Sequence, residues 1–81
     1  MRARYTERFL RSYRDAPPAV RKAFQKQSVL LLGNLQHPSL HAKKYDPSHD
    51  IWQGRVNRNW RFYFTIEGDC YVLLDMMPHP K

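Results

Sequence analysis

Apolar and polar residues alternate through residues 51–66, IWQGRVNRNWRFYFTI, and this alternation predicts a β-hairpin. In a first strand, Trp52, Gly54 and Val56 share one face because successive side chains of a strand point to opposite sides. After a short polar interruption the same apolar face continues in a second strand, at Trp60, Phe62, Phe64 and Ile66. The hairpin is therefore expected to have one apolar face that packs into the core.

The interruption at residues 57–59, Asn-Arg-Asn, fits a three-residue loop, because Asn tolerates the left-handed conformation that such loops require. An odd loop length sets the register, so that Arg55 lies opposite Arg61 and Gln53 lies opposite Tyr63 on the face away from the apolar side chains. Two cations directly across a ladder repel each other, which costs stability unless an anion sits between them. This pair gives a first indication of function.

The N-terminal half predicts a short strand and two helices. Residues 2–5 alternate basic and apolar, as in a short edge strand with Ala3 and Tyr5 inward. Thr6 suits the N-cap of a short helix that ends before the turn at residues 15–18. A second helix over residues 18–32 can begin at Pro18 and ends at Gly33 and Asn34. The apolar stripes of the two helices are Phe9, Leu10 and Tyr13, and Val20, Ala23, Phe24, Leu30 and Leu31.

The remaining segments complete the order β-α-α-β-β-β. Residues 35–50 are polar and contain two prolines, so we expect a loop with a short extended segment near residues 40–45. Residues 67–69 supply a tight turn, and residues 71–76 predict a strand that is buried on both faces. Residues 77–81 are too short and Pro-rich for a closing helix. The expected fold is a small α+β domain over residues 1–81, with an antiparallel-rich sheet covered by the helical hairpin on its apolar face.

The net charge of the chain limits the classes of partner that it is expected to bind. The chain carries 14 Lys and Arg against 7 Asp and Glu, with a net charge of +7 and a pI of about 10.0, which favours nucleic acid or an acidic protein as partner. The alternative is a basic surface that only confers solubility. The single Cys70 indicates a reducing compartment, and the cytoplasm is expected. We expect no membrane partner, since no apolar run approaches the roughly 18 residues of a membrane span and no signal-peptide core is evident.

A metal or another cofactor is not expected. Asp46 and Asp50 lie in the polar loop, Asp69 lies in a turn and Asp75 stands alone in an apolar strand, so no carboxylate pair is placed to hold magnesium. Two of the histidines, at positions 37 and 41, have helical spacing, but Pro38 opposes a helix there and no third ligand is evident. Chemistry would then rest on side-chain cations and proton donors.

Three segments together carry a resemblance to a known family. They are YTERFLRSYRDAPPAVRKAFQKQSVLLLGNLQHPSLHAKKY, IWQGRVNRNWRFYFTIEGD and the closing MMPHP, and their order and spacing extend over the whole chain. The sequence resembles the RelE/ParE superfamily of toxins from bacterial and archaeal toxin–antitoxin modules. The resemblance implies a RelE-like fold, neutralisation by a cognate antitoxin, and cleavage of messenger RNA on the ribosome without a metal. In that branch the 2′-hydroxyl attacks the adjacent phosphate and leaves a cyclic phosphate and a 5′-hydroxyl.

The resemblance also implies roles for particular residues. Arg55 and Arg61 match the basic residues that clamp the phosphate, His79 matches a proton donor or acceptor near the C-terminus, and Lys44 belongs to a basic pair that touches phosphate or deprotonates the nucleophile. Further RNA contacts are expected from Lys43, Arg58, Tyr63 and Gln53. The structural alternatives are an Arg61–Asp75 ion pair with a solvated Arg55, an unstructured tail at His79, solvated lysines at 43 and 44, and a half-buried structural role for Tyr63.

Two departures from the pattern keep a second hypothesis open. RelE-like nucleases commonly carry a further aromatic residue or arginine after the histidine region, which this chain lacks, and Gln53 stands where some of them carry a basic residue. The alternative is a ParE-like inhibitor that binds DNA gyrase, or a degenerate relative that only binds its antitoxin. Arg55 and Arg61 together with His79 favour the RNA-directed hypothesis, with the ribosome and messenger RNA as partners.

Overall fold

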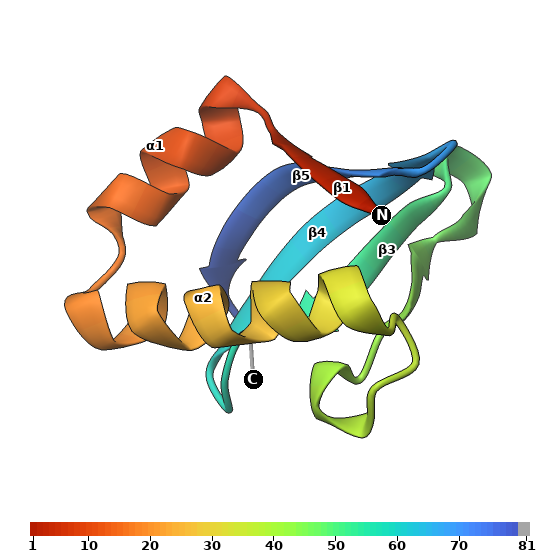
Figure 1. The fold of residues 1–81 in the computed structure, drawn as a ribbon. Helices are drawn as coiled ribbons and strands as arrows, with labels where there is room; N and C mark the ends of the chain where they lie inside the picture. Colours follow the sequence, from red (N-terminus) through yellow and green to blue (C-terminus); the bar gives the residue numbers. More distant parts are fainter. Residues whose placement is uncertain (80–81) are drawn as a thin grey trace.

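A five-stranded sheet with the strand order β1-β5-β4-β3-β2 forms the centre of the computed structural model, which describes residues 1–79 (Figure 1). β1 runs parallel to β5, and the other neighbouring strands are antiparallel. This confirms the predicted α+β class and antiparallel-rich sheet. The strands are β1 (Arg2–Tyr5), β2 (Lys43–Asp46), β3 (Ile51–Arg55), β4 (Trp60–Glu67) and β5 (Cys70–Pro78).

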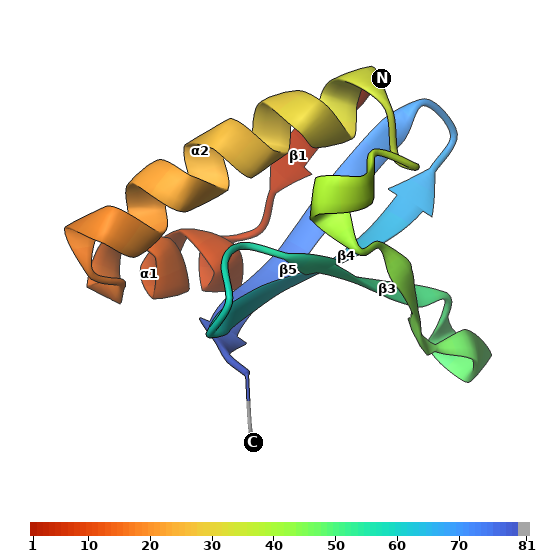
Figure 2. The same ribbon diagram turned by 90° about the horizontal axis from the view of Figure 1, so that it is seen from below.

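Two helices, α1 (Glu7–Asp15) and α2 (Pro18–Gly33), pack on one face of this sheet, with α2 lying across it (Figure 2). The Thr6 hydroxyl accepts a hydrogen bond of 3.1 Å from the backbone N–H of Phe9, which confirms Thr6 as the N-cap of α1. α2 ends after Gly33, one residue later than the pattern predicts. No helix within residues 1–79 is long and apolar enough to cross a membrane.

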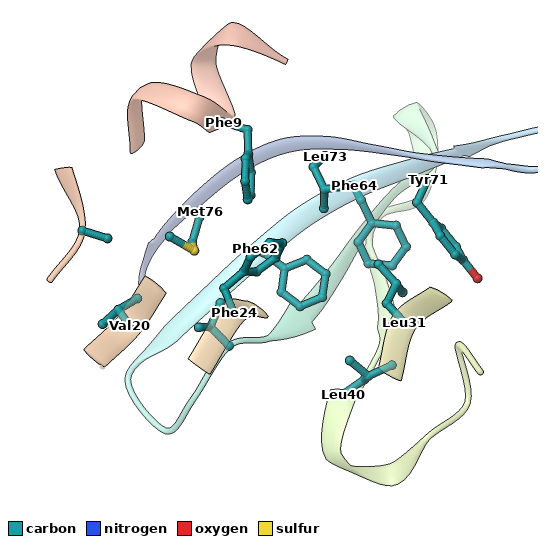
Figure 3. Packing of buried hydrophobic residues seen from close by; sticks show 12 residues of the cluster. Phe9, Val20, Phe24, Leu31, Leu40, Phe62, Phe64, Tyr71, Leu73 and Met76 are labelled. Carbon is teal, nitrogen blue, oxygen red and sulfur yellow. The ribbon is translucent and has the colours of Figure 1, made fainter. Parts of the chain in front are cut away.

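The core lies between α2 and the central strands (Figure 3). Phe62 and Phe64 of β4 are completely buried, and Phe24 of α2 meets Phe62 edge-on with the ring centroids 5.4 Å apart. Gly54 lies opposite Phe62 on β3, and a Cβ atom at that position would overlap the Phe62 ring. The glycine therefore makes room for the central aromatic residue of the core.

The β3–β4 hairpin has the predicted register. Arg55 pairs with Arg61 and Gln53 pairs with Tyr63, so these four side chains occupy the face opposite the buried phenylalanines. We call this surface, which faces away from α2, the open face of the sheet. The odd-length loop is closed by a 3.0 Å hydrogen bond from the Val56 N–H to the Trp60 carbonyl.

The short extended segment predicted near residues 40–45 is confirmed as β2, but it pairs as an edge strand of the sheet, whereas the predicted order β-α-α-β-β-β did not count it as a strand. It pairs with β3 over Lys43–Asp46, between 3₁₀ helices at Pro38–Leu40 and Pro47–His49. The two prolines that suggested a loop occupy the first positions of those short helices, where a missing N–H is tolerated. The sheet consequently has a fifth strand at its β3 edge, and Lys43 of this strand lies on the open face.

A β-bulge on β5 explains why an aspartate occurs within an apolar strand. Phe64 pairs with Leu73, whereas Tyr63 pairs with Asp75, which leaves Leu74 as an extra residue. The bulge turns Leu74 and Asp75 toward the open face, and Met76 returns to the core. The prediction of a strand buried on both faces is confirmed for residues 71–76, of which only Leu74 is partly exposed. Asp75 lies on the open face, where the side chains of Arg8 and Ser12 reach its carboxylate from α1.

Candidate functional site

A pocket of about 340 Å³ opens on the sheet face opposite α2, at the end of the sheet near the β3–β4 loop. Side chains from three strands, from the segment before β2 and from the segment after β5 meet there. Two of them are the arginines that face each other across the β3–β4 ladder. The lining residues are His41, Ala42, Lys43, Gln53, Arg55, Arg61 and His79.

Arg61 is held at the pocket by backbone carbonyls. Its Nη1 donates hydrogen bonds of 2.8 Å to the Asn57 carbonyl and 2.9 Å to the Trp60 carbonyl. Burial lowers the pKa of the Arg61 guanidinium, and the nearby charge of Arg55 lowers this pKa further. The two cations lie opposite each other as the register predicts, and backbone carbonyls rather than a carboxylate hold the Arg61 guanidinium in position.

Arg55 is anchored less tightly than Arg61. Its Nε donates to the Asn57 carbonyl at 3.4 Å, and its Nη1 lies 3.2 Å from Nε2 of His41. Because a guanidinium is only a donor, this contact is a hydrogen bond when His41 Nε2 is unprotonated. Neither Arg55 nor Arg61 forms a salt bridge within the described part of the chain. Two positive charges thus face the pocket without an acidic partner.

The alternative Arg61–Asp75 ion pair is wrong. Asp75 accepts a hydrogen bond of 3.0 Å from Nε of Arg8 and one of 2.6 Å from the Ser12 hydroxyl, so its carboxylate is engaged by α1. The bulge on β5 directs this carboxylate to α1. Arg61 remains available to an anion from outside the molecule.

His79 lies at the rim of the same pocket because the hairpin loop binds its backbone. The His79 N–H donates to the Asn59 carbonyl at 2.7 Å, directly after the last ladder pair, Trp60 with Pro78. The imidazole is exposed. The alternative of an unstructured tail is wrong as far as His79, since this residue is joined to the loop that also fixes Arg61.

The two lysines of β2 point in opposite directions. Lys43 pairs with Gln53 and lines the pocket. Lys44 pairs with Trp52, and its Nζ lies 5.3 Å from the Trp52 ring centroid and 2.8 Å from Oδ1 of Asp50. Strand parity therefore separates Lys44 from the catalytic group that it was predicted to join. Lys44 lowers the pKa of Asp50 instead.

Solved structures with similar folds agree over nearly the whole chain. A chain of the RelB-RelE antitoxin-toxin complex from Methanococcus jannaschii matches with a TM-score of 0.77 and 17% sequence identity, covering 93% of this chain and 88% of that chain. The isolated RelE toxin of E. coli matches with a TM-score of 0.77 at 15% identity, covering 99% and 85%. YafQ from E. coli matches with a TM-score of 0.79 at 14% identity, covering 98% and 94%.

This protein has the RelE-like fold. The predicted RelE-like fold is thereby confirmed. No protein-family model matches the sequence, and a search of curated proteins gives no match. In this RelE-like fold the pocket with Arg55, Arg61 and His79 lies on the open face, and the helical hairpin covers the other face.

Three of the residues predicted to contact RNA lie at or near the pocket but differ in accessibility. Gln53 and Tyr63 are only 6% and 7% exposed, and Nε2 of Gln53 donates to the Tyr63 hydroxyl at 3.2 Å. This burial favours the structural role of Tyr63, because its ring has little free surface for stacking. Arg58 is exposed at the loop tip, outside the pocket lining, and its carbonyl accepts from Arg61 at 3.4 Å.

The structure adds two residues that the sequence did not single out for this site. His41 has a left-handed backbone, with φ 46°, and its ring contacts Arg55. The sequence places His41 two residues before Lys43, but strand parity does not extend to it, because its left-handed backbone ends the 3₁₀ helix and β2 begins only at Lys43. Gln27 of α2 is buried and donates to the carbonyls of Ser39 and Arg55, at 2.9 and 2.8 Å. The sequence could have indicated that Gln27 is buried, because it lies three residues after Phe24 and four before Leu31, on the apolar face of α2.

The other histidines have local partners. His37 Nδ1 accepts a hydrogen bond from the Ser39 N–H, and His49 Nδ1 lies 2.9 Å from Oδ2 of Asp46. Hydrogen bonds from Ser48 and His49 lower the pKa of Asp46. Across residues 1–79, no three His, Cys, Asp or Glu side chains converge in a group that could hold a metal ion.

Proposed function

We propose that this protein is the toxin of a toxin–antitoxin pair and acts as a metal-independent, ribosome-dependent endonuclease of messenger RNA. The observation that carries the proposal is the pair of guanidiniums, Arg55 and Arg61, which face each other beside one pocket without acidic partners in the described residues. A cleft with two fixed positive charges suits a phosphodiester. The RelE-like fold and the sequence resemblance support the same assignment.

In the proposed reaction the two arginines clamp the scissile phosphate. The 2′-hydroxyl oxygen attacks the adjacent phosphorus and loses its proton, and the bond from phosphorus to the 5′-oxygen breaks. The 5′-oxygen takes up a proton, so the products are a 2′,3′-cyclic phosphate and a 5′-hydroxyl. Negative charge grows on the non-bridging oxygens in the transition state, and Arg55 and Arg61 stabilise it by donating hydrogen bonds.

Proton transfer falls to the remaining side chains of the pocket. His79 is exposed at its rim, and an imidazole can take or give a proton near neutral pH. Lys43 lines the opposite side, from the edge strand β2. Lys44 takes no part in the proposed reaction, because its ammonium is paired with Asp50 on the face opposite to the pocket. Its role is to hold the end of β2 against Trp52.

A cognate antitoxin is the proposed protein partner, and the cytoplasm is the proposed compartment. The net charge of +7 favours an acidic antitoxin segment that folds on binding. Structural neighbours include RelB-RelE antitoxin-toxin complexes, among them one from Pyrococcus horikoshii OT3. Pull-down after co-expression with the product of the adjacent gene checks this partner, and the absence of any complex would contradict it.

The decisive experiment is cleavage of a ribosome-bound messenger by the purified protein, mapped by primer extension. We expect cuts within the decoding-site codon that survive treatment of the protein with EDTA. An Arg55→Ala/Arg61→Ala variant should lose at least about 10²-fold in rate, the typical cost of one lost transition-state donor. Lys26→Gln, which removes an exposed charge on the outer side of α2, serves as the matched control and should cut normally.

Absence of cleavage in this assay would refute the proposed endonuclease activity. If the wild-type protein binds its antitoxin but gives no cut at any concentration, the endonuclease is refuted. The ParE-like alternative then predicts that the protein inhibits DNA supercoiling by gyrase. A gyrase assay with the same preparation separates this alternative from a degenerate toxin that only binds its antitoxin.

A further inference from the structure

A second pocket, of about 240 Å³, lies on the same open face next to the arginine pair. We call it the Tyr45 pocket, and its lining includes Arg8, Tyr45, Tyr63, Asp75 and Met77. Its volume is below the range of about 300–1,000 Å³ that is typical of sites for drug-sized ligands, so it suits a single planar ring system.

The aromatic floor of this pocket is held in place but remains accessible. Tyr45 is 58% exposed, and its ring meets the Tyr63 ring edge-on, with the centroids 4.9 Å apart. Tyr63 is itself fixed by its hydrogen bond from Gln53. Met77 adds a partly exposed apolar surface on the β5 side. An accessible ring backed by a buried one is a suitable platform for stacking of a nucleobase.

Arg8 gives the pocket a directed hydrogen-bond donor. Its Nε is bound by Asp75, which is only 9% exposed and is oriented further by Ser12 and by the Met76 N–H at 2.8 Å. The Arg8 side chain is nevertheless 73% exposed, and its two terminal nitrogens have no hydrogen-bond partner among residues 1–79. An arginine fixed through Nε presents these two nitrogens as a fork. A fork of this kind matches O6 and N7 of guanine.

The register places the Tyr45 pocket within one nucleotide of the arginine pair. Arg61 pairs with Met77, and Tyr63 pairs with Asp75, so the two sites are separated by one step of two residues along β4 and β5. That step is about 6.7 Å long. A strand of RNA with its phosphate at Arg55 and Arg61 can therefore reach the Tyr45 pocket with a neighbouring base.

We propose that the Tyr45 pocket binds the base of the nucleotide next to the clamped phosphate and prefers guanine. The base stacks on Tyr45 and accepts hydrogen bonds at O6 and N7 from the terminal nitrogens of Arg8. Asp75 positions Arg8 for this contact. The positive charges of Arg55 and Arg61 on the same face, which have no acidic partner among residues 1–79, match the phosphates of single-stranded RNA. This inference rests on the proposed function and adds a base preference to it.

The test measures binding of short uridine-rich RNA oligonucleotides that contain a single guanine, adenine or cytosine, by fluorescence anisotropy at low salt. We expect the guanine oligonucleotide to bind most tightly. Tyr45→Leu should weaken its binding by about 5- to 150-fold, the typical effect of losing one stacking contact. Arg8→Lys keeps the charge and an ion pair with Asp75 but loses the fork, so it should retain general affinity and lose the guanine preference.

Two matched variants control for charge and for loss of an aromatic ring. Lys26→Gln removes a positive charge from α2, and Tyr5→Leu removes a partly exposed tyrosine from β1, away from the open-face pockets. Neither should change binding by more than about twofold. Circular dichroism and thermal unfolding check that all four variants are folded.

The results that would refute base binding at the Tyr45 pocket differ from those that would refute the proposed endonuclease. If binding depends on Arg55 and Arg61 but Tyr45→Leu and Arg8→Lys leave affinity and base preference unchanged, the Tyr45 pocket is refuted and the phosphate clamp stands. If the wild-type protein neither binds RNA nor cleaves it on the ribosome, both proposals are refuted.

Discussion

Gln27→Met is the substitution that best probes how the helical layer supports the site. Gln27 is 7% exposed, and its amide nitrogen donates to two carbonyls, those of Ser39 and Arg55. Ser39 lies two residues before His41, and Arg55 is one half of the proposed clamp. The Gln27 side chain of α2 therefore connects the C-terminal end of β3 to the segment that carries His41 by hydrogen bonds.

The expected cost follows from these two bonds. Met fills a similar volume but donates nothing, so both carbonyls lose their partner. Each net hydrogen bond contributes about 1 kcal/mol, and a carbonyl left without a partner costs about 1–3 kcal/mol. The lower cost of burying a thioether than an amide offsets part of the loss. We expect a destabilisation of about 2 kcal/mol, which corresponds to a decrease in Tm of roughly 8–16 °C for a domain of this size.

Urea and thermal unfolding followed by circular dichroism measure this effect, with Gln25→Met as the matched control. Gln25 lies on the same helix but is exposed, and its amide donates to the Tyr13 hydroxyl at the surface. Its replacement should change the free energy of unfolding by no more than about 0.5 kcal/mol. Equal stability of the two variants would refute the role assigned to the buried amide.

Two further predictions concern the core. Gly54→Ala should destabilise the fold by about 1–3 kcal/mol in urea unfolding, because the added methyl group overlaps the Phe62 ring; an unchanged midpoint would show that the ring can move aside. Burial raises the pKa of Tyr71, so its contribution to stability is complete below the ordinary value near 10 and is lost as the pH rises through the higher folded value. Tyr71→Phe should therefore unfold at a higher Tm than wild type only above about pH 10, and a difference that is the same at neutral pH would contradict this explanation.

The register of the hairpin could be predicted because the information is local. An odd loop between two alternating strands allows only one pairing that keeps both apolar faces together. Arg55 and Arg61 were therefore placed opposite each other from the sequence alone. The same reasoning does not reach β5, because an almost continuous apolar run has no alternation that shows which side chain faces which side. The bulge there is accompanied by contacts from α1 to Asp75, which are distant in sequence.

The separation of Lys43 from Lys44 shows a second limit. Adjacent residues of a strand face opposite sides, but which lysine joins the arginines depends on the pairing of β2 with β3. β2 is short, polar and flanked by prolines, so its sequence resembles a loop. Tyr45 was overlooked for the same reason, since its position against Tyr63 exists only once β2 is part of the sheet.

The parallel pairing of β1 with β5 has a consequence for the order of folding. Arg2 aligns with Cys70, and the Thr6 hydroxyl donates to the Leu73 carbonyl, so the first strand has no partner until the last one is available. The β3–β4 hairpin is local and can form within microseconds, whereas closing a loop of this length is slower. During synthesis, Arg55 and Arg61 should face each other early. His79, which follows β5, can join them only after residues 1–79 have left the ribosome that made them.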